Sequence, residues 1–248
     1  MNNILLASPV RQSPEILKLF LESLSRLNKN DSIDYLFVDD NDDAESKKIL
    51  IEQIHKNKCT IWTSDELKHH YLKTDVTHEW DYKSVWRLAK IKDRVISYAK
   101  ENNYDYLFLI DSDVLIKPDT IDRLISRGKD IICNIFWTPW QPNTKPMPQV
   151  WLQDLYSFDA DPEFMDKLRV PGIYEVGGLG ACTLISKAAI QKGVKFAQLH
   201  NVSFWGEDRH FCIRAVALGL QLFVDTTEPG FHIYRNSDIA QAHEYLKQ

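Results

Sequence analysis

Two carboxylates, Asp111 and Asp113, stand at the end of the apolar run 107–110. Such a run is too short for a helix and is typical of a strand buried on both faces of a parallel sheet. Ligands of such sheets bind just beyond the carboxyl ends of the strands. Carboxylates this close together repel each other, and a divalent cation that prefers oxygen ligands, Mg²⁺ or Mn²⁺, would relieve the repulsion. The Asp-x-Asp pattern therefore indicates a metal that holds phosphate groups; an exposed acidic turn is the alternative interpretation.

A second acidic pair, Glu207 and Asp208, lies in the first turn of a predicted helix, 204–218. Acids at this position offset the helix dipole, which is a structural reason for the pair. Lys92 projects among the apolar residues of another predicted helix, 84–101. Its ammonium group either extends to the rim of the sheet or serves as a counter-ion for a bound phosphate. The Asp-x-Asp pattern slightly favours the phosphate role.

The helix 84–101 also carries a basic stripe. Its apolar residues fall on one side at about 100° per residue, as in an amphipathic helix. The stripe lies almost opposite that apolar side and consists of Lys83, Arg87, Lys90 and Arg94. We expect these four side chains to form a solvated face.

An aromatic, proline-rich segment occupies 137–171. The stretch FWTPWQPNTKPMPQVW contains four prolines and three tryptophans: Trp137, Trp140 and Trp151. A long segment without regular structure in a compact domain is usually a lid or binding loop. Tryptophans provide platforms for flat apolar ligand faces, including those of sugars. A binding role is favoured, and a proline-braced segment that covers the core is the alternative.

The elements that position these residues alternate between strand and helix. The predicted strands are 3–7, 33–38, 59–62, 107–110, 130–136, 181–186 and 220–224, and the predicted helices are 14–27, 44–56, 84–101, 119–127, 187–193 and 204–218. Residues 63–82 are predicted to form a loop, and the glycines of 177–180 to allow either a close backbone approach or a tight hairpin. The pattern predicts an α/β fold, in which a mostly parallel central sheet is flanked by helices.

Composition bounds the class of protein. The chain has 248 residues, 44% of them apolar, and a net charge of −5, which does not favour nucleic acid as a partner. Four separated cysteines form no CxxC pair, so a reducing, cytoplasmic location is expected. We predict no signal peptide and no transmembrane segment. A single domain covers 1–248, with a nucleotide-binding half, 1–118, and an acceptor and catalytic half, 119–248.

Four motifs in this order carry a family resemblance: LFLIDSDVLI, VGGLG, WGEDRHFC and FHIY. The sequence from about residue 4 to residue 234 resembles the nucleotide-sugar glycosyltransferases of the GT-A fold, particularly the family 2-like group. The acids after the second predicted strand are denser than the usual Asp-Gly-Ser ending, so the residue that reads the nucleobase stays open. No Gln-x-x-Arg-Trp signature of processive synthases is present, which favours the addition of a single sugar.

The resemblance implies a metal and a donor. Asp113 would bind Mn²⁺ or Mg²⁺ directly, Asp111 would bind the metal or the donor ribose, and His232 would be the third protein ligand, although a lone histidine is more often structural. The metal would bridge the two phosphates of the donor, a UDP-sugar foremost. The donor-binding residues implied by the resemblance are Ser8, Pro9, Val10, Arg11, Asp39 with Asp40 as its rival, Asp111 and Gly178. Lys92 and Ser112 are further candidates for donor binding.

The resemblance also implies a base and an acceptor site. An inverting transfer needs a carboxylate that takes the proton of the attacking hydroxyl, and Asp208 is the expected base, with Glu207 orienting the acceptor or supporting the turn. The tryptophans Trp137, Trp140 and Trp151 would build the site for a carbohydrate, lipid-linked or protein acceptor. A retaining enzyme without a dedicated base stays an alternative. The expected location is the cytoplasm, including its membrane surface.

Three other classes fit the sequence less well. A phosphatase of the haloacid dehalogenase type also ends a strand in Asp-x-Asp, but it expects Thr or Val where Leu115 stands. A nucleotidylyltransferase would carry a glycine-rich loop after the first strand, and the stretch SPVRQ has no glycine. A non-catalytic carbohydrate-binding module would have no use for all four acids of the two motifs together. We therefore expect a glycosyltransferase.

Overall fold

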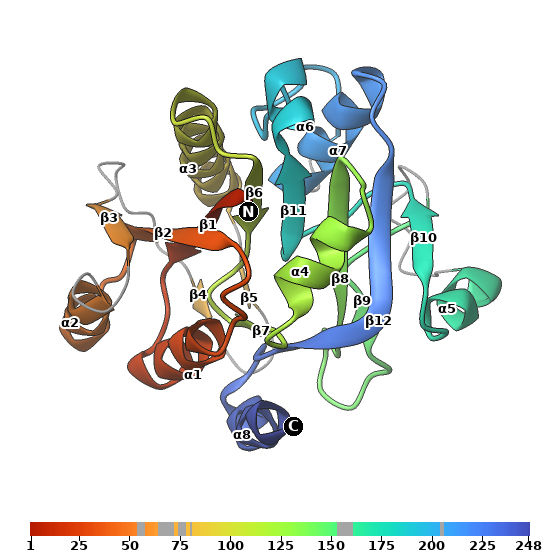
Figure 1. Ribbon diagram of the computed structural model, residues 1–248. Helices are drawn as coiled ribbons and strands as arrows, with labels where there is room; N and C mark the ends of the chain where they lie inside the picture. The colour runs from red at the N-terminus through yellow and green to blue at the C-terminus, as the bar shows by residue number, and fades with distance from the viewer. Residues whose placement is uncertain (54–57, 64–71, 74–77, 80, 153–160, 204–205) are drawn as a thin grey trace.

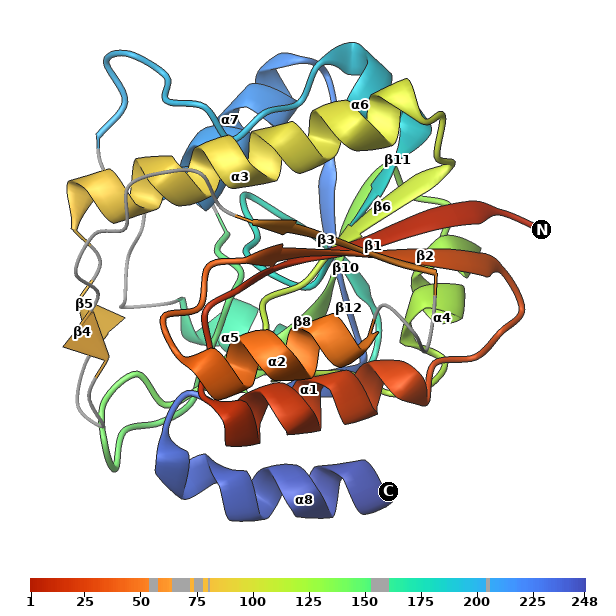
Figure 2. The ribbon, with the colours of Figure 1, turned by 90° about the vertical axis from the view of Figure 1, so that its left-hand side faces the viewer.

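The apolar run 107–110 becomes a central strand of a twisted sheet (Figures 1 and 2). The structure is a computed structural model that describes residues 1–53, 58–63, 72–73, 78–79, 81–152, 161–203 and 206–248. The expectations for residues 54–56, for most of 63–82, for 153–160 and for the helix start at 204–205 lie outside the described residues.

The first half of the chain forms the parallel part of the sheet. Its strands are β1 (Asn3–Val10), β2 (Ser32–Asp39), β3 (Cys59–Thr63) and β6 (Tyr106–Leu109), in the order β3-β2-β1-β6. Every neighbouring pair among them is parallel. The carboxyl ends of β1, β2 and β6 therefore meet at one edge, as predicted, and the acids that follow β2 and β6 gather there.

The second half makes the sheet mixed. Its principal strands are β8 (Ile131–Thr138), β10 (Ile173–Val176), β11 (Thr183–Ser186) and β12 (Leu222–His232), in the order β10-β12-β8-β11 next to β6. Strand β11 runs antiparallel to both β6 and β8, and β10 runs antiparallel to β12. The sheet is thus less parallel than predicted, because hydrophobic runs alone do not show the direction in which a strand enters the sheet.

Helices cover both faces of this sheet (Figure 2). One core lies under α1 (Pro14–Ser25), α2 (Ala44–Gln53), α4 (Thr120–Ser126) and α8 (Ile239–Lys247). The other lies under α3 (Tyr82–Glu101), α5 (Pro162–Leu168), α6 (Lys187–Lys192) and α7 (Glu207–Ala217). Among the described residues, none of the helices is both long and apolar enough to span a bilayer.

Local sequence signals explain the ends of these helices. The Asp81 side chain accepts a hydrogen bond from the Ser84 backbone N–H and caps α3. Gly193 adopts a φ of +94° directly after α6, where a residue with a Cβ would be strained. Ser13 occupies the N-cap of α1 as predicted, with Pro14 in the first turn, but its side chain makes no capping hydrogen bond.

Several predicted boundaries are corrected. Strand β1 continues to Val10, β8 to Thr138 and β12 to His232, because each keeps pairing with its neighbour. The segment 137–171 is not without structure, since it contains β9 (Met147–Pro148) and α5. Within 63–82, β4 (Leu72–Lys73) pairs with β5 (His78–Glu79). The described strands β10 and β11 do not pair with each other, so the glycines between them form no hairpin.

Candidate active site

A two-residue strand brings the Asp-x-Asp acids to His232. Strand β7 (Val114–Leu115) pairs with the end of β12, so that Val114 lies opposite His232. The backbone N–H of Ile233 donates a hydrogen bond to the carbonyl oxygen of Asp113 at 2.8 Å. As a result, Nε2 of His232 lies 3.6 Å from Oδ1 of Asp113. The structure thus brings together residues that are far apart in the sequence.

The His232 ring has a defined orientation. Its Nδ1 lies 2.7 Å from the Thr138 hydroxyl at the end of β8. An imidazole that donates from Nδ1 to this hydroxyl keeps an unprotonated Nε2 towards Asp113, which is the state that binds a metal. Two carboxylates and one imidazole fit a divalent cation in donor type. The described residues hold no group of three acidic, histidine or cysteine side chains already converged on one point.

Gln12 is a site residue that the sequence interpretation did not assign. Its side-chain amide donates to Oδ2 of Asp113 at 3.2 Å, the oxygen not facing His232. Its backbone N–H donates to the Asn41 side chain at 2.8 Å, which links the loops after β1 and β2. Only its position after β1 points to such a role, because a single glutamine has no recognisable spacing.

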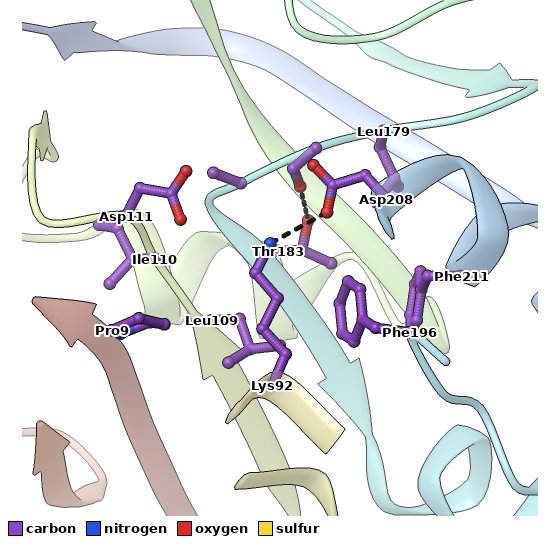
Figure 3. A pocket seen from close by; sticks show the side chains of 12 residues that line it. Pro9, Lys92, Leu109, Ile110, Asp111, Leu179, Thr183, Phe196, Asp208 and Phe211 are labelled. Atoms are coloured by element: carbon purple, nitrogen blue, oxygen red, sulfur yellow. Dashed lines mark hydrogen bonds and ion pairs between the residues drawn. The ribbon is translucent and has the colours of Figure 1, made fainter. Parts of the chain in front are cut away.

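The acidic start of α7 faces the Asp-x-Asp end of β6 across a small pocket (Figure 3). Lys92 of α3 reaches this pocket between Leu109 and Phe196. Its Nζ donates to Oε1 of Glu207 at 2.7 Å and to Oδ1 of Asp208 at 3.1 Å. The pocket is lined by Pro9, Lys92, Leu109, Ile110, Asp111, Leu179, Gly180, Ala181, Thr183, Phe196, Asp208 and Phe211.

Electrostatics at this pocket are dominated by three carboxylates around one ammonium group. Burial raises the pKa of Asp208 to about 7; Lys92 opposes the rise, and the charges of Glu207 and Asp111 add to it. Burial also raises the pKa of Asp111, against the attraction of Lys92. Burial disfavours the charge of Lys92, but the carboxylates outweigh it and hold its pKa well above the usual value. Such shifts are common where acids or bases do chemistry.

The residues expected to hold the nucleotide occupy different surroundings. Ser8 and Val10 are buried within β1, not in a loop, and Pro9 lines the pocket. Arg11 pairs with Asp42 at 2.6 Å near the surface. Ser112 is buried directly between the two acids.

The acids at the end of β2 form hydrogen bonds and an ion pair within the protein. Asp39 accepts hydrogen bonds from the backbone and side chain of Asn41. Asp40 forms a bidentate ion pair with Arg87 of α3, in which Nη1 of Arg87 lies 2.7 Å from Oδ2 of Asp40. Arg87 is only 7% exposed, so the prediction of a solvated face is wrong for this residue, although Lys83, Lys90 and Arg94 are exposed. The periodicity of α3 could not show its partner on another strand.

A tryptophan fills the space above Gly178. A Cβ at Gly178 would lie 1.9 Å from Cε2 of Trp151. The backbones of the two residues also pair, since the Gly178 N–H donates to the Trp151 carbonyl at 3.1 Å. In this structure Gly178 thus accommodates the indole of Trp151, and its expected contact with a donor sugar stays a prediction.

This contact predicts a stability effect. Gly178→Ala should destabilise the protein by about 1–3 kcal/mol, the usual cost of overpacking, because Trp151 must move. Urea unfolding would measure it, and the double variant Gly178→Ala/Trp151→Ala should lose this penalty relative to Trp151→Ala alone. An unchanged midpoint in the single variant would contradict the role of the indole.

The three tryptophans do not form one platform. Trp140 packs edge-on against Tyr234, with ring centroids 5.3 Å apart, and lies 6.4 Å from the His232 ring. Arg235 fixes this position by donating to the carbonyl oxygens of Pro139 and Trp140 at 2.6 and 2.8 Å. Trp137 and Trp151 instead pack against the core that α3, α5, α6 and α7 cover. Only Trp140 is thus placed beside the Asp113–His232 end of the site.

Comparison with protein families now adds to this geometry. A family model described as "Glycosyltransferase family 25, N-terminal domain" matches residues 1–138, which is more than half of the chain. The chain belongs to this glycosyltransferase family. The match includes β6 and both Asp-x-Asp acids, and the predicted glycosyltransferase resemblance is confirmed. No curated protein matches the chain by sequence.

Solved structures share the fold of this family 25 chain at low identity. TarS 1–349 of S. aureus is 12% identical with a TM-score of 0.57, covering 98% of this chain and 64% of that one. Its complex with UDP-GlcNAc is 12% identical with a TM-score of 0.56, covering 98% and 65%. GalNAc-T7 with UDP, GalNAc and Mn²⁺ is 12% identical with a TM-score of 0.62, covering 94% and 43%. The chain therefore spans less than two thirds of these solved chains, and the likeness confirms the predicted GT-A type fold.

Proposed function

We propose that this chain transfers one sugar from a nucleoside-diphosphate sugar, a UDP-sugar foremost, to an acceptor hydroxyl with inversion of the anomeric carbon. The observation that carries the proposal is the shared pocket of Asp111 and Asp208, with Asp113 and His232 3.6 Å apart beside it. Family membership supports the reaction class. Two neighbours of the same fold were solved with UDP-GlcNAc, or with UDP, GalNAc and Mn²⁺, which supports the donor.

The chain's own residues would divide the work as follows. Asp111, Asp113 and His232 would hold Mn²⁺ or Mg²⁺, which supplies positive charge for the departing diphosphate. Asp208 would accept the proton of the acceptor hydroxyl as its oxygen bonds to the anomeric carbon and the bond to the diphosphate oxygen breaks. Trp140 would contact the carbohydrate, lipid-linked or protein acceptor near His232. All four cysteines are free thiols. The proposal includes the cytoplasmic location that these separated cysteines led us to expect.

The decisive experiment measures nucleoside diphosphate release. The protein is incubated with UDP-, GDP- and dTDP-sugars, each with and without Mn²⁺, and thermal shifts with the bare nucleotides identify the base. Release from one donor, dependent on metal, supports the proposal. Nucleotide binding without release from any donor, with simple sugars offered as acceptors, would favour a binding protein instead.

Metal removal should stop the reaction. We expect chelation by EDTA to abolish release and Mn²⁺ to restore it, because Asp111 and Asp113 would otherwise repel the diphosphate. Asp113→Asn removes a proposed ligand and should raise the Mn²⁺ concentration needed by at least about 10–100-fold, the range seen for outer-shell partners of metal ligands. A titration of Mn²⁺ against the initial rate measures this. Full activity after exhaustive chelation would contradict the metal assignment.

The pH dependence should report the proposed base. Because burial raises the pKa of Asp208 to about 7, the carboxylate is protonated below that pH and cannot accept a proton. We therefore expect kcat/KM to rise with pH through the region of pH 7, with about a tenfold fall per unit on the acid side. Initial rates at subsaturating donor across the pH range measure this limb. A profile that is flat from pH 5 to pH 8 would count against Asp208 as the base.

A further inference from the structure

The ammonium group of Lys92 is buried, and its hydrogen bonds go to the first turn of α7. Lys92 is only 4% exposed, and its Nζ lies 4.9 Å from the centroid of the Phe196 ring. A buried charge is costly unless it is paired and hydrogen-bonded. It donates hydrogen bonds to Glu207 and Asp208, both in the first turn of α7. The ammonium group of Lys92 therefore does not reach solvent at the rim of the sheet, which was one of the two roles open from the sequence.

The two oxygens of Asp208 have different surroundings. Oδ1 accepts the hydrogen bond of Lys92 at 3.1 Å. Oδ2 lies over Gly180, where an added Cβ would come within 3.3 Å of it. The Asp208 side chain keeps 31% of its surface exposed, whereas that of Glu207 keeps 10%. One oxygen of Asp208 is thus anchored by Lys92, and the side chain as a whole stays partly exposed, unlike that of Glu207.

We infer that Lys92 is a positioning residue, which fixes Oδ1 of Asp208 so that Oδ2 faces the acceptor, and which is not a counter-ion of the donor diphosphate. The inference rests on the proposed function, because it presupposes that Asp208 is the base. Glu207 completes the arrangement: its shorter contact, 2.7 Å, holds the ammonium group in place beneath Asp208. The same interactions join the middle of α3 to the start of α7.

Charge supports the geometry. The charged groups that face Lys92 are Glu207 and Asp208 from α7 and Asp111 from the end of β6. These carboxylates hold the pKa of Lys92 well above its usual value, so it stays charged at neutral pH. Lys92 in turn lowers the pKa of Asp208 against the effect of burial. Loss of the ammonium group should therefore leave Asp208 both less oriented and harder to deprotonate.

The test is Lys92→Met, which keeps the apolar stem and removes the charge. We expect kcat to fall by about 10–100-fold, the effect of misplacing a catalytic group by about 1 Å. The acid limb of kcat/KM should move to higher pH, and the dissociation constant of UDP measured with Mn²⁺ should stay unchanged. Weakened UDP binding with an unshifted limb would overturn the inference in favour of the phosphate role. If neither kcat nor the acid limb of kcat/KM changes, Lys92 has only a structural role.

A second variant covers the case in which Lys92→Met leaves Glu207 buried without a partner and fails to fold. Lys92→Met/Glu207→Gln removes both charges and should restore the thermal midpoint, yet kcat should stay low because Oδ1 of Asp208 has lost its anchor. Wild-type kcat in the double variant would refute the inference. If Asp208→Asn is inactive and Lys92→Met keeps the wild-type kcat, the inference about Lys92 is wrong and the base assignment stands. An active Asp208→Asn would instead remove the base assignment beneath it.

Discussion

Asp208→Asn should reduce sugar transfer by about 10²–10⁴-fold, the contribution typical of a general base, while UDP still binds. The amide has nearly the same shape as the carboxylate and can still accept the hydrogen bond from Lys92, so the start of α7 should keep its position. It has no basic oxygen to take the proton of the acceptor hydroxyl. Initial rates of UDP release and a UDP titration with Mn²⁺ measure the two expectations separately.

An exposed acid provides a matched control for this substitution. Asp166 lies on the solvent side of α5, away from the residues that line the pocket. Asp166→Asn makes the same chemical change, and the rate should stay at that of the unmodified protein. If Asp208→Asn also retains turnover, Asp208 is not the base, and the stereochemistry of the product would then distinguish a retaining transfer that needs no dedicated base.

The positions of the four acids in the fold, at a strand end and at a helix start, were predictable because they depend on local order in the sequence. Asp111 and Asp113 follow an apolar run that is typical of a buried strand, and ligands collect at the ends of such strands. Glu207 and Asp208 follow a glycine and precede a helical pattern, which fixes them to a first turn. Neither inference needs any knowledge of distant residues. For the same reason, most helices and strands were found within a few residues of their observed bounds.

The partners of these residues were not predictable from the sequence. The hydrogen bonds of Lys92 depend on α7, which begins 115 positions later in the chain. Trp151 and Gly178 were given separate ligand roles, but they contact each other. In the same way, β11 is antiparallel because of the path of the chain before it, which the hydrophobic pattern of β11 does not contain. Local periodicity shows which side of an element is apolar, but it does not identify what covers the other side.

Arg87 is a further residue whose partner local periodicity could not identify, and here we expect a large effect on stability. Arg87→Met should destabilise the protein by about 3–5 kcal/mol, because it leaves the Asp40 carboxylate buried without its counter-charge. The side chains of Arg87 and Asp40 are 7% and 11% exposed, so water can replace little of the lost interaction. An exposed residue of the same basic stripe, Lys83, provides the control: Lys83→Met should change the unfolding free energy by less than about 0.5 kcal/mol.

A double variant separates the ion pair from the packing of its aliphatic parts. Asp40→Asn/Arg87→Met removes both charges, and replacing a buried pair by neutral groups is often close to neutral in stability. We therefore expect the double variant to be more stable than Arg87→Met, as measured by urea unfolding at pH 7. If Arg87→Met unfolds at the same urea concentration as the unmodified protein, the pair is not a buried support of the site. In that case Asp40 would be free to read the nucleobase, the role that the sequence left open for it.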